Sequence, residues 1–183
     1  MALLLVGFIS CKDDDTVEPA FVNNGEVSVL LNGEDFLSQF KAGVRAGTES
    51  SCLSGNLLLF INYYNEADIE RMGFSVLNIP FEEGTYTIHR ITPPSQACSS
   101  DTVYANFGTT ISDGDVNGDF YLPLEEAQNQ ITVTSHNPSA REVQGRFDIT
   151  FVITDEHRQN KTVIDAPDTI RLTEGEFKVR YDL

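Results

Sequence analysis

Hydrophobic and polar residues alternate with a period of two along most of the chain after residue 25, a pattern typical of strands with one buried face. The apolar run at 57–64 is nearly continuous and therefore predicts a central strand buried on both faces. The predicted strands are 27–31, 57–64, 74–79, 86–88, 103–107, 120–124, 131–133, 143–153, 170–172 and 177–181. The pattern predicts an all-β fold, an antiparallel β-sandwich of about ten short strands, with a β-barrel as the alternative.

Turn residues separate these strands. Asn32-Gly33 predicts a tight hairpin after the first strand. Residues 135–140 and the pair Glu174-Gly175 predict two further turns. Only the segment from Asn65 to Arg71 predicts a helix, a turn or two long, with Asn65 as its cap and acidic residues in its first turn.

The N-terminus has a different pattern. Ala2 to Ile9 is an apolar run, too short for a bilayer span of about 20 residues and typical of the core of a signal peptide. Ser10-Cys11 follows directly and resembles a bacterial lipobox, which implies cleavage before Cys11 and a lipid on Cys11. No Lys or Arg precedes the run, although a signal peptide starts with positive charge, so we expect the natural start to lie upstream of Met1.

An acidic segment, Lys12 to Asp15, follows the cysteine. It is similar to the export signals of Bacteroidota lipoproteins, and this implies a place on the outer face of the outer membrane, with the periplasmic face as the alternative. We therefore expect a signal peptide at 1–10, a lipidated cysteine with a flexible acidic tether at 11–24, and a single β-sandwich domain at 25–183.

Five strand and turn segments of the domain occur in a familiar order: 31–36, 84–88, 130–134, 143–147 and 174–179. With these segments the domain resembles an uncharacterised family of small β-sandwich lipoproteins found on the surface of Bacteroidota. The segments are strand and turn motifs, so the resemblance implies a fold and a location. It implies no catalytic residue.

The charge balance narrows the choice of partners. The chain has 28 Asp and Glu against 12 Lys and Arg, for a net charge of −16. Because nucleic-acid binding depends on cations that displace counterions from phosphates, this composition excludes nucleic acid as an expected partner.

The two remaining cysteines, Cys52 and Cys98, lie in Ser-rich segments of a chain that we expect to be exported. They are a candidate disulfide, and two unrelated thiols are the alternative.

One motif suggests a metal. The segment 113–119 matches the first half of a calcium loop, with Asp113, Asp115 and Asn117 as side-chain ligands and Asp119 as a carbonyl ligand. Leu124 stands where an EF-hand has its bidentate Glu, so this is not an EF-hand. The segment predicts either a Ca²⁺ loop in a β-sandwich or a polar hairpin loop.

Other candidate sites are weaker. His89, His136 and His157 lack metal-ligand spacing and are predicted to be surface histidines, with the last two in turns. The paired acids at 82–83 and 125–126 are the only sequence support for a glycosidase. Thr16, Thr102 and Thr169 each follow Asp and precede Val or Ile, which resembles the O-glycosylation sites of exported Bacteroidota proteins.

These features together predict a lipid-anchored protein of the cell envelope with a non-catalytic binding or structural role. Its expected partners are the outer membrane, through the lipid, and glycans or other surface proteins. One alternative is a calcium-dependent carbohydrate-binding or adhesion module. The other is a glycoside hydrolase-like enzyme that uses paired carboxylates.

Overall fold

A computed structural model describes residues 23–35, 40–48, 56–90, 102–162 and 165–182. The predicted signal peptide (1–10), Cys11, Thr16, Cys52 and Cys98 lie outside these residues. The strands are β1 (Gly25–Leu31), β2 (Glu34–Asp35), β3 (Lys41–Thr48), β4 (Leu57–Tyr64), β5 (Glu70–Ile79), β6 (Gly84–Thr87), β7 (Tyr104–Ile111), β8 (Val116–Pro123), β9 (Gln130–Asn137), β10 (Glu142–Ile153) and β11 (Thr169–Asp182). The helix α1 (Asp155–Gln159) lies between β10 and β11. The all-β prediction is confirmed.

All eleven strands belong to one hydrogen-bonded sheet, in the order β2-β1-β11-β3-β4-β5-β7-β8-β10-β9-β6. A further pairing between β10 and β11 joins two strands that are distant in this order, so the hydrogen bonding forms a closed circuit. One pairing departs from the antiparallel prediction: the end of β11 runs parallel to β3, with Tyr181 opposite Ala46.

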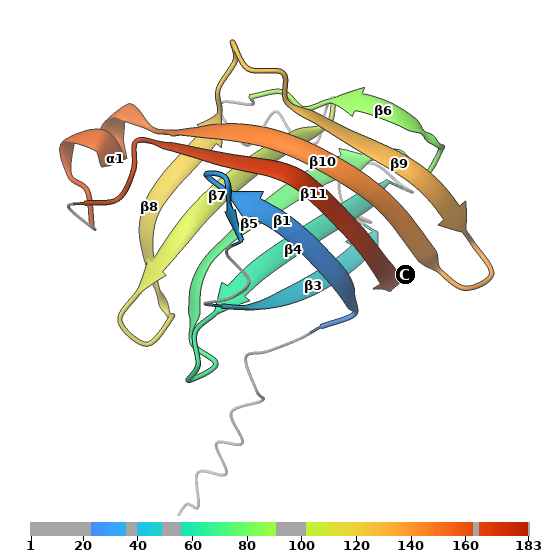
Figure 1. Cartoon of the computed structure of the whole chain (residues 1–183), viewed down its shortest axis with the longest axis horizontal. Helices are drawn as coiled ribbons and strands as arrows, with labels where there is room; N and C mark the ends of the chain where they lie inside the picture. The colour runs from blue at the N-terminus through green and yellow to red at the C-terminus, as the bar shows by residue number, and fades with distance from the viewer. Residues whose placement is uncertain (1–22, 36–39, 49–55, 91–101, 163–164, 183) are drawn as a thin grey trace, which may run out of the picture.

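The sheet folds over into two layers, as Figure 1 shows, with β9, β10 and β11 crossing in front of β3, β4 and β5. Aromatic side chains from the two layers meet in the core. The ring of Phe74 on β5 lies edge-on to that of Phe147 on β10, with the centroids 5.2 Å apart. Phe107 on β7 contacts Phe151 on β10 at 5.7 Å. These contacts make the interior continuous between the layers.

Two reciprocal aromatic–glycine pairs connect β10 and β11. Phe147 lies directly opposite Gly175, and Gly145 lies directly opposite Phe177. A Cβ added at Gly175 would come within 2.3 Å of the Phe147 ring, and one at Gly145 within 2.6 Å of the Phe177 ring. Each glycine is therefore required because a ring from the partner strand occupies the space of its side chain.

The predicted turn at Glu174-Gly175 is wrong, because β11 continues through it. Glu174 has a positive φ of 54° and forms a β-bulge, and the register shifts here against both β1 and β10. Its N–H donates to Oδ1 of Asp148 at 3.1 Å. A bulge inserts one extra residue and bends a strand without reversing it, and the same Glu-Gly sequence suits either structure.

The predicted helix at 65–71 is also wrong. Oδ1 of Asn65 does accept the N–H groups of Ala67 and Ile69, but these bonds close a turn between β4 and β5. Asp68 has a φ of 56°, which ends any helical geometry. The structure instead places its helix at α1, which no sequence pattern had indicated. No helix among the described residues is long and apolar enough to span a membrane.

The strand β4 is central, as predicted, but it is not buried on both faces. Leu57, Leu59 and Ile61 are fully buried, whereas Leu58 and Phe60 between them are partly exposed. The guanidinium of Arg45 lies over the Phe60 ring, 5.9 Å from its centroid. The Arg45 cation covers the Phe60 ring, so the partly exposed face of β4 can carry an apolar residue. For this reason the apolar run in the sequence has no polar residue at Phe60.

Candidate functional site

A polar groove of about 420 Å³ lies on the outer face of the layer formed by β4, β5, β7 and β8. Two glycines that face each other across β5 and β7, Gly73 and Gly108, help to form its floor. A Cβ at Gly108 would meet nothing closer than 4.0 Å, so the hollow comes partly from the missing side chain. The side chains around this floor are amides, hydroxyls and carboxylates.

One wall of the groove is built by a β-bulge at the start of β5. Met72 is opposite Tyr63 and Glu70 is opposite Tyr64, so Arg71 is the extra residue. A bulge changes the direction in which the neighbouring side chains point. Glu70 consequently lines the outer groove, where its Oε2 accepts Nδ2 of Asn62 at 2.8 Å.

The environment of Glu70 is mixed. Partial burial raises the pKa of its carboxyl group, and this effect outweighs the opposing effects of the Asn62 amide, the positive charge of Arg45 and the hydroxyl of Tyr64. A partly buried carboxyl group has already lost part of its hydration shell, so a neutral ligand removes less water when it binds there.

A second bulge, on β8, builds the facing wall. Gly118 and Asp119 together oppose the single residue Thr109. The N–H of Asp119 donates to Oγ1 of Thr109 at 2.7 Å, and a Cβ at Gly118 would lie only 2.4 Å from the same oxygen. Here a glycine is required by close approach, and the bulge turns the Asp119 carboxylate inward.

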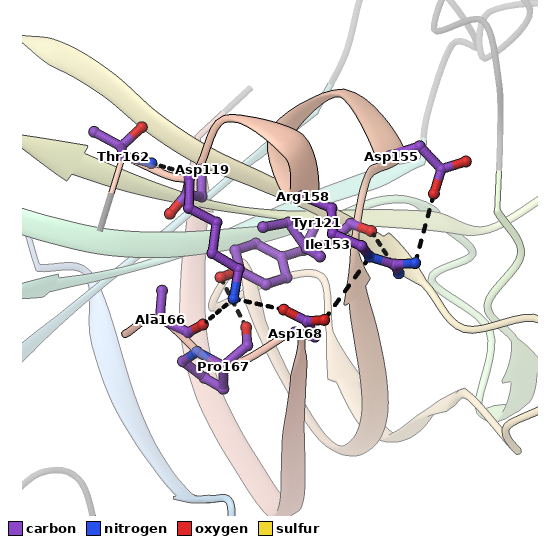
Figure 2. Close-up of polar contacts among 10 residues, drawn as sticks. Asp119, Tyr121, Ile153, Asp155, Arg158, Thr162, Ala166, Pro167 and Asp168 are labelled. Carbon is purple, nitrogen blue, oxygen red and sulfur yellow. Dashed lines mark hydrogen bonds and ion pairs between the residues drawn. The ribbon is translucent and has the colours of Figure 1, made fainter. Parts of the chain in front are cut away.

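The Asp119 carboxylate already has polar partners within the protein. Its side chain is 0% exposed, and Oδ1 accepts the N–H of Thr162 at 2.8 Å (Figure 2). Nδ1 of His157 on α1 lies 4.0 Å from the same oxygen. A buried carboxylate requires such partners. Asp119 therefore holds α1 and the following segment against the edge of the groove, where it is not accessible to a ligand.

The remaining polar groups of the groove are amides and hydroxyls. Oγ of Ser75 donates to Oδ1 of Asn106 at 3.0 Å, which orients that amide across the two strands. Asn117 is exposed on β8, and its side chain makes no hydrogen bond to any residue that the structure describes. Phe120 adds a partly exposed ring that lies 6.5 Å from the His157 ring. The wall thus combines hydrogen-bonding groups with one apolar surface.

The segment that joins β10 to β11 closes one end of the molecule, and we call it the β10–β11 connection (154–162 and 165–168). Polar contacts hold it together, as Figure 2 shows. Nζ of Lys161 lies 2.6 Å from the carbonyl oxygen of Ala166 and 2.5 Å from the Asp168 carboxylate. Arg158 lies 3.9 Å from the same carboxylate. The Tyr121 hydroxyl donates to the carbonyl of Pro167 at 3.1 Å, which attaches the connection to β8.

The structure divides the four residues predicted as calcium ligands. Asp113 and Asp115 lie in the β7–β8 turn, whereas Asn117 and Asp119 lie in β8. A hydrogen bond between the two turn carboxyls lowers the pKa of Asp113 and raises that of Asp115. Within the described part of the chain, no group of three or more His, Cys, Asp or Glu side chains is placed to hold a metal ion. Calcium binding stays a prediction that depends on the Asp113–Asp115 pair.

Of the other predicted residues that the structure describes, His89, His136, Thr102 and Thr169 do not line the groove, whereas His157 does. His89 is exposed, as predicted. His136 lies in β9 and not in a turn, and its Nε2 is 3.0 Å from the Tyr181 hydroxyl. Thr102 precedes β7 and Thr169 begins β11, both partly buried. The prediction of a turn position for His157 is wrong as well, because it belongs to α1, at the edge of the groove.

Comparisons with known proteins identify no relative: no protein-family model, curated protein or solved structure matches the chain. The groove must therefore be interpreted from its own chemistry. Its key residues Asn62, Glu70 and Asn106 come from three strands with no fixed spacing between them, so no sequence motif could have found them.

Proposed function

We propose that this chain is a lipid-anchored, non-catalytic binding protein of the cell surface, and that the polar groove binds a neutral carbohydrate. The observation that carries this proposal is the set of amide, hydroxyl and carboxyl groups around a glycine floor, next to one partly exposed ring. Planar amide and carboxyl groups present two hydrogen-bonding atoms side by side, which suits the adjacent hydroxyls of a sugar. The Phe120 ring offers a surface for the C–H face of a sugar.

Charge favours a neutral ligand. No Lys or Arg is among the described residues that line the groove, whereas Glu70 and Asp119 are. A phosphorylated or sulfated sugar would meet repulsion there, as it would from a chain with a net charge of −16. The hydroxyl groups of a neutral sugar meet no such repulsion, and the groove offers them both hydrogen-bond donors and acceptors.

The anchor is proposed from the sequence. The apolar run that ends at Ser10-Cys11 supports a lipid on Cys11, and the acidic residues behind it support export to the outer face of the outer membrane. Several acyl chains on one cysteine would hold the protein stably, because a single chain is marginal. A disulfide between Cys52 and Cys98 belongs to the same proposal. Alkylation and mass spectrometry of the non-reduced protein test it: two labelled thiols would disprove the bridge.

Binding is favoured over hydrolysis because of Asp119. A glycosidase needs two accessible carboxyl groups on either side of the bond that it cleaves. The described residues that line the groove include two carboxyl groups, but that of Asp119 is fully buried and bonded to Thr162. Among these residues the Glu70 carboxyl alone is open to a substrate, which suits recognition better than the acid and base pair of hydrolysis.

A glycan array and calorimetric titration with the full chain test the proposal. We expect binding to neutral oligosaccharides, reduced at least about tenfold by the double substitution Asn106→Ala, Asn117→Ala. Gln144→Ala is the matched control, since it removes a partly exposed amide on β10, outside the groove. If no sugar binds, or if both variants weaken binding equally, the proposal is wrong. Release of reducing ends during the assay would instead support the hydrolase alternative.

The calcium-dependent version has its own test. Thermal melts of the full chain in EDTA and in about 1 mM Ca²⁺ should differ if the metal binds only the folded state. We expect any upward shift to disappear in the double substitution Asp113→Ala, Asp115→Ala. Equal melting temperatures in EDTA and Ca²⁺ would leave carbohydrate binding independent of metal.

A further inference from the structure

A second hollow, which we call the end cavity, lies between the two layers beside the β10–β11 connection. Its volume is about 500 Å³. Met72 of β5 and Phe107 of β7 come from one layer, and Leu31 of β1 and Ile170 of β11 come from the other. Pro167 of the connection lies against the same space. The end cavity is therefore a continuation of the core that side chains leave unfilled.

The walls of the end cavity are apolar because its hydroxyl groups are used elsewhere. The Tyr121 hydroxyl donates to the carbonyl of Pro167 at 3.1 Å. The hydroxyl of Thr110 donates to the carbonyl of Glu70. A water molecule needs two to four polar partners to be stable in a protein interior, and such a surface offers few. An apolar ligand is the better occupant, and the volume lies within the range of about 300–1,000 Å³ of small-molecule sites.

Arg71 gives the end cavity a positive charge, and it is the one charged side chain among the described residues that line it. The bulge that turns Glu70 toward the polar groove also makes Arg71 the extra residue of β5. Nη1 of Arg71 donates to the carbonyl of Ser112 at 2.8 Å. A guanidinium has five N–H donors, so this bond orients it and leaves donors for a carboxylate.

We propose that the end cavity binds a long-chain fatty acid, with the alkyl chain between the layers and the carboxylate at Arg71. Each methylene removed from water adds to the affinity, so the alkyl chain supplies most of it. The carboxylate needs a local cation because the protein as a whole repels anions, with its net charge of −16. This site shares Thr109 and Thr110 with the lining of the polar groove, but the proposal does not depend on the carbohydrate proposal.

Fluorescence titration with cis-parinaric acid tests the site directly. The protein is the full chain with Cys11→Ser, so that no acyl group of its own competes for the cavity. We expect saturable binding of one molecule per chain, displaced by palmitate. A signal that rises without saturation, or that palmitate does not displace, would overturn the proposal.

Two filling substitutions locate the ligand. Ala166→Trp fills the end cavity from the connection, and Leu31→Phe fills it from β1. We expect each to weaken cis-parinaric acid binding at least about tenfold while circular dichroism stays native. Ala140→Trp is the matched control, because Ala140 is exposed in the β9–β10 turn. If a folded Ala166→Trp and a folded Leu31→Phe bind like the control, the ligand lies elsewhere and the proposal fails.

The role of Arg71 is tested with two ligands that differ only in the head group. Arg71→Gln keeps a donor for the Ser112 carbonyl but removes the charge. We expect about tenfold weaker binding of palmitate and unchanged binding of hexadecanol. Equal losses for both ligands would disprove recognition of a carboxylate. Binding of the fatty acid and of the sugar can each fail alone, since Ala166 and Leu31 do not line the groove.

Discussion

The β10–β11 pair and the connection between the same two strands are stabilised by different chemistry. The pair is held by rings that fill the space above glycines, Phe147 over Gly175 and Phe177 over Gly145. The connection is held by Lys161, Arg158 and the acids around them. The first depends on shape and excluded water, which change little with pH or salt. The second depends on charge, which both conditions alter. We therefore expect the two regions to respond to different experiments.

The largest effect should come from removing a ring. Phe147 is 1% exposed and contacts rings of both layers, so Phe147→Ala should lower the free energy of unfolding by about 3–5 kcal/mol. Urea denaturation measures this change. The loss of unfolding free energy should be the same at pH 6 and pH 8, and at low and high salt. A strong dependence on salt would contradict the comparison.

Gly175→Ala tests the same pair from the other strand. Its added Cβ would collide with the Phe147 ring and should cost about 1–3 kcal/mol. Gly47→Ala is the matched control in β3, because a Cβ there meets nothing within 4 Å. In the Phe147→Ala background the cost of Gly175→Ala should fall, since the ring is gone. Additive costs would show that the two residues do not interact.

A smaller effect is expected at Tyr121, which belongs to both regions: its ring is in the core and its hydroxyl bonds the connection. Burial raises the pKa of Tyr121 to about 12. The unfolded chain loses this proton near pH 10, so it binds fewer protons than the folded protein above that pH. Stability should therefore fall as the pH rises from about 10 to about 12, by at most about 3 kcal/mol.

Tyr121→Phe should make this alkaline fall shallower in urea melts taken at several pH values. Part of the fall should remain, because burial also raises the pKa of Tyr63. An unchanged slope would mean that Tyr121 titrates normally in the folded protein.

Substitution of Glu70 should stabilise the protein, unlike the substitutions at Phe147 and Gly175. Burial raises the pKa of its carboxyl group, so the charged form is disfavoured in the folded protein and costs stability as the pH rises above about 4.5. Glu70→Gln should increase the stability at pH 7 by less than about 1 kcal/mol after screening by solvent, and this gain should vanish at low pH. Glu125→Gln, at an exposed position, is the control for net charge. A loss of stability at pH 7 would contradict the burial argument.

The smallest effect is expected in the connection itself. A hydrogen bond from Lys161 lowers the pKa of Asp168, so the pair adds stability that is lost as the pH falls below about 4. Lys161→Met should lower the melting temperature slightly at low ionic strength and hardly at all in high salt, because the pair is accessible to solvent. An equal decrease in both buffers would show that Lys161 acts through packing.

Alternation along the sequence predicted most of the strands, because a buried face imposes a period of two on a strand. It missed β2, which has only two residues, and β3, which is rich in Gly and Ala and has a single large apolar residue, Val44. The sequence-based prediction failed where the same residue fits two different local structures. Asn65 accepts the same N–H groups in a turn as it would at a helix cap. Glu174 adopts a left-handed conformation that suits a turn or a bulge. Which structure forms depends on the neighbouring strands, and these are distant in the sequence.

The candidate site was harder to predict for the same reason. Asn117 and Asp119 were predicted as ligands because they lie in a calcium-like motif. Both flank the groove, where Asn117 is exposed and the Asp119 carboxylate accepts the N–H of Thr162. The bulges that direct Glu70 and Asp119 exist only because two strands of unequal local length pair. Register is a property of the folded sheet, so neither bulge leaves a pattern in the chain.

The order of the strands has a consequence for how copies of this domain meet one another. An open sheet edge presents unpaired main-chain groups on which another molecule can add a strand, the first step toward aggregation. The ends of this sheet are β2, with two residues, and β6, with four. Both residues of β2, Glu34 and Asp35, are acidic and exposed. A neighbouring copy therefore finds a short, negatively charged edge at β2 that repels its own and a short edge at β6, so copies of the domain can be crowded together without growing into a fibre.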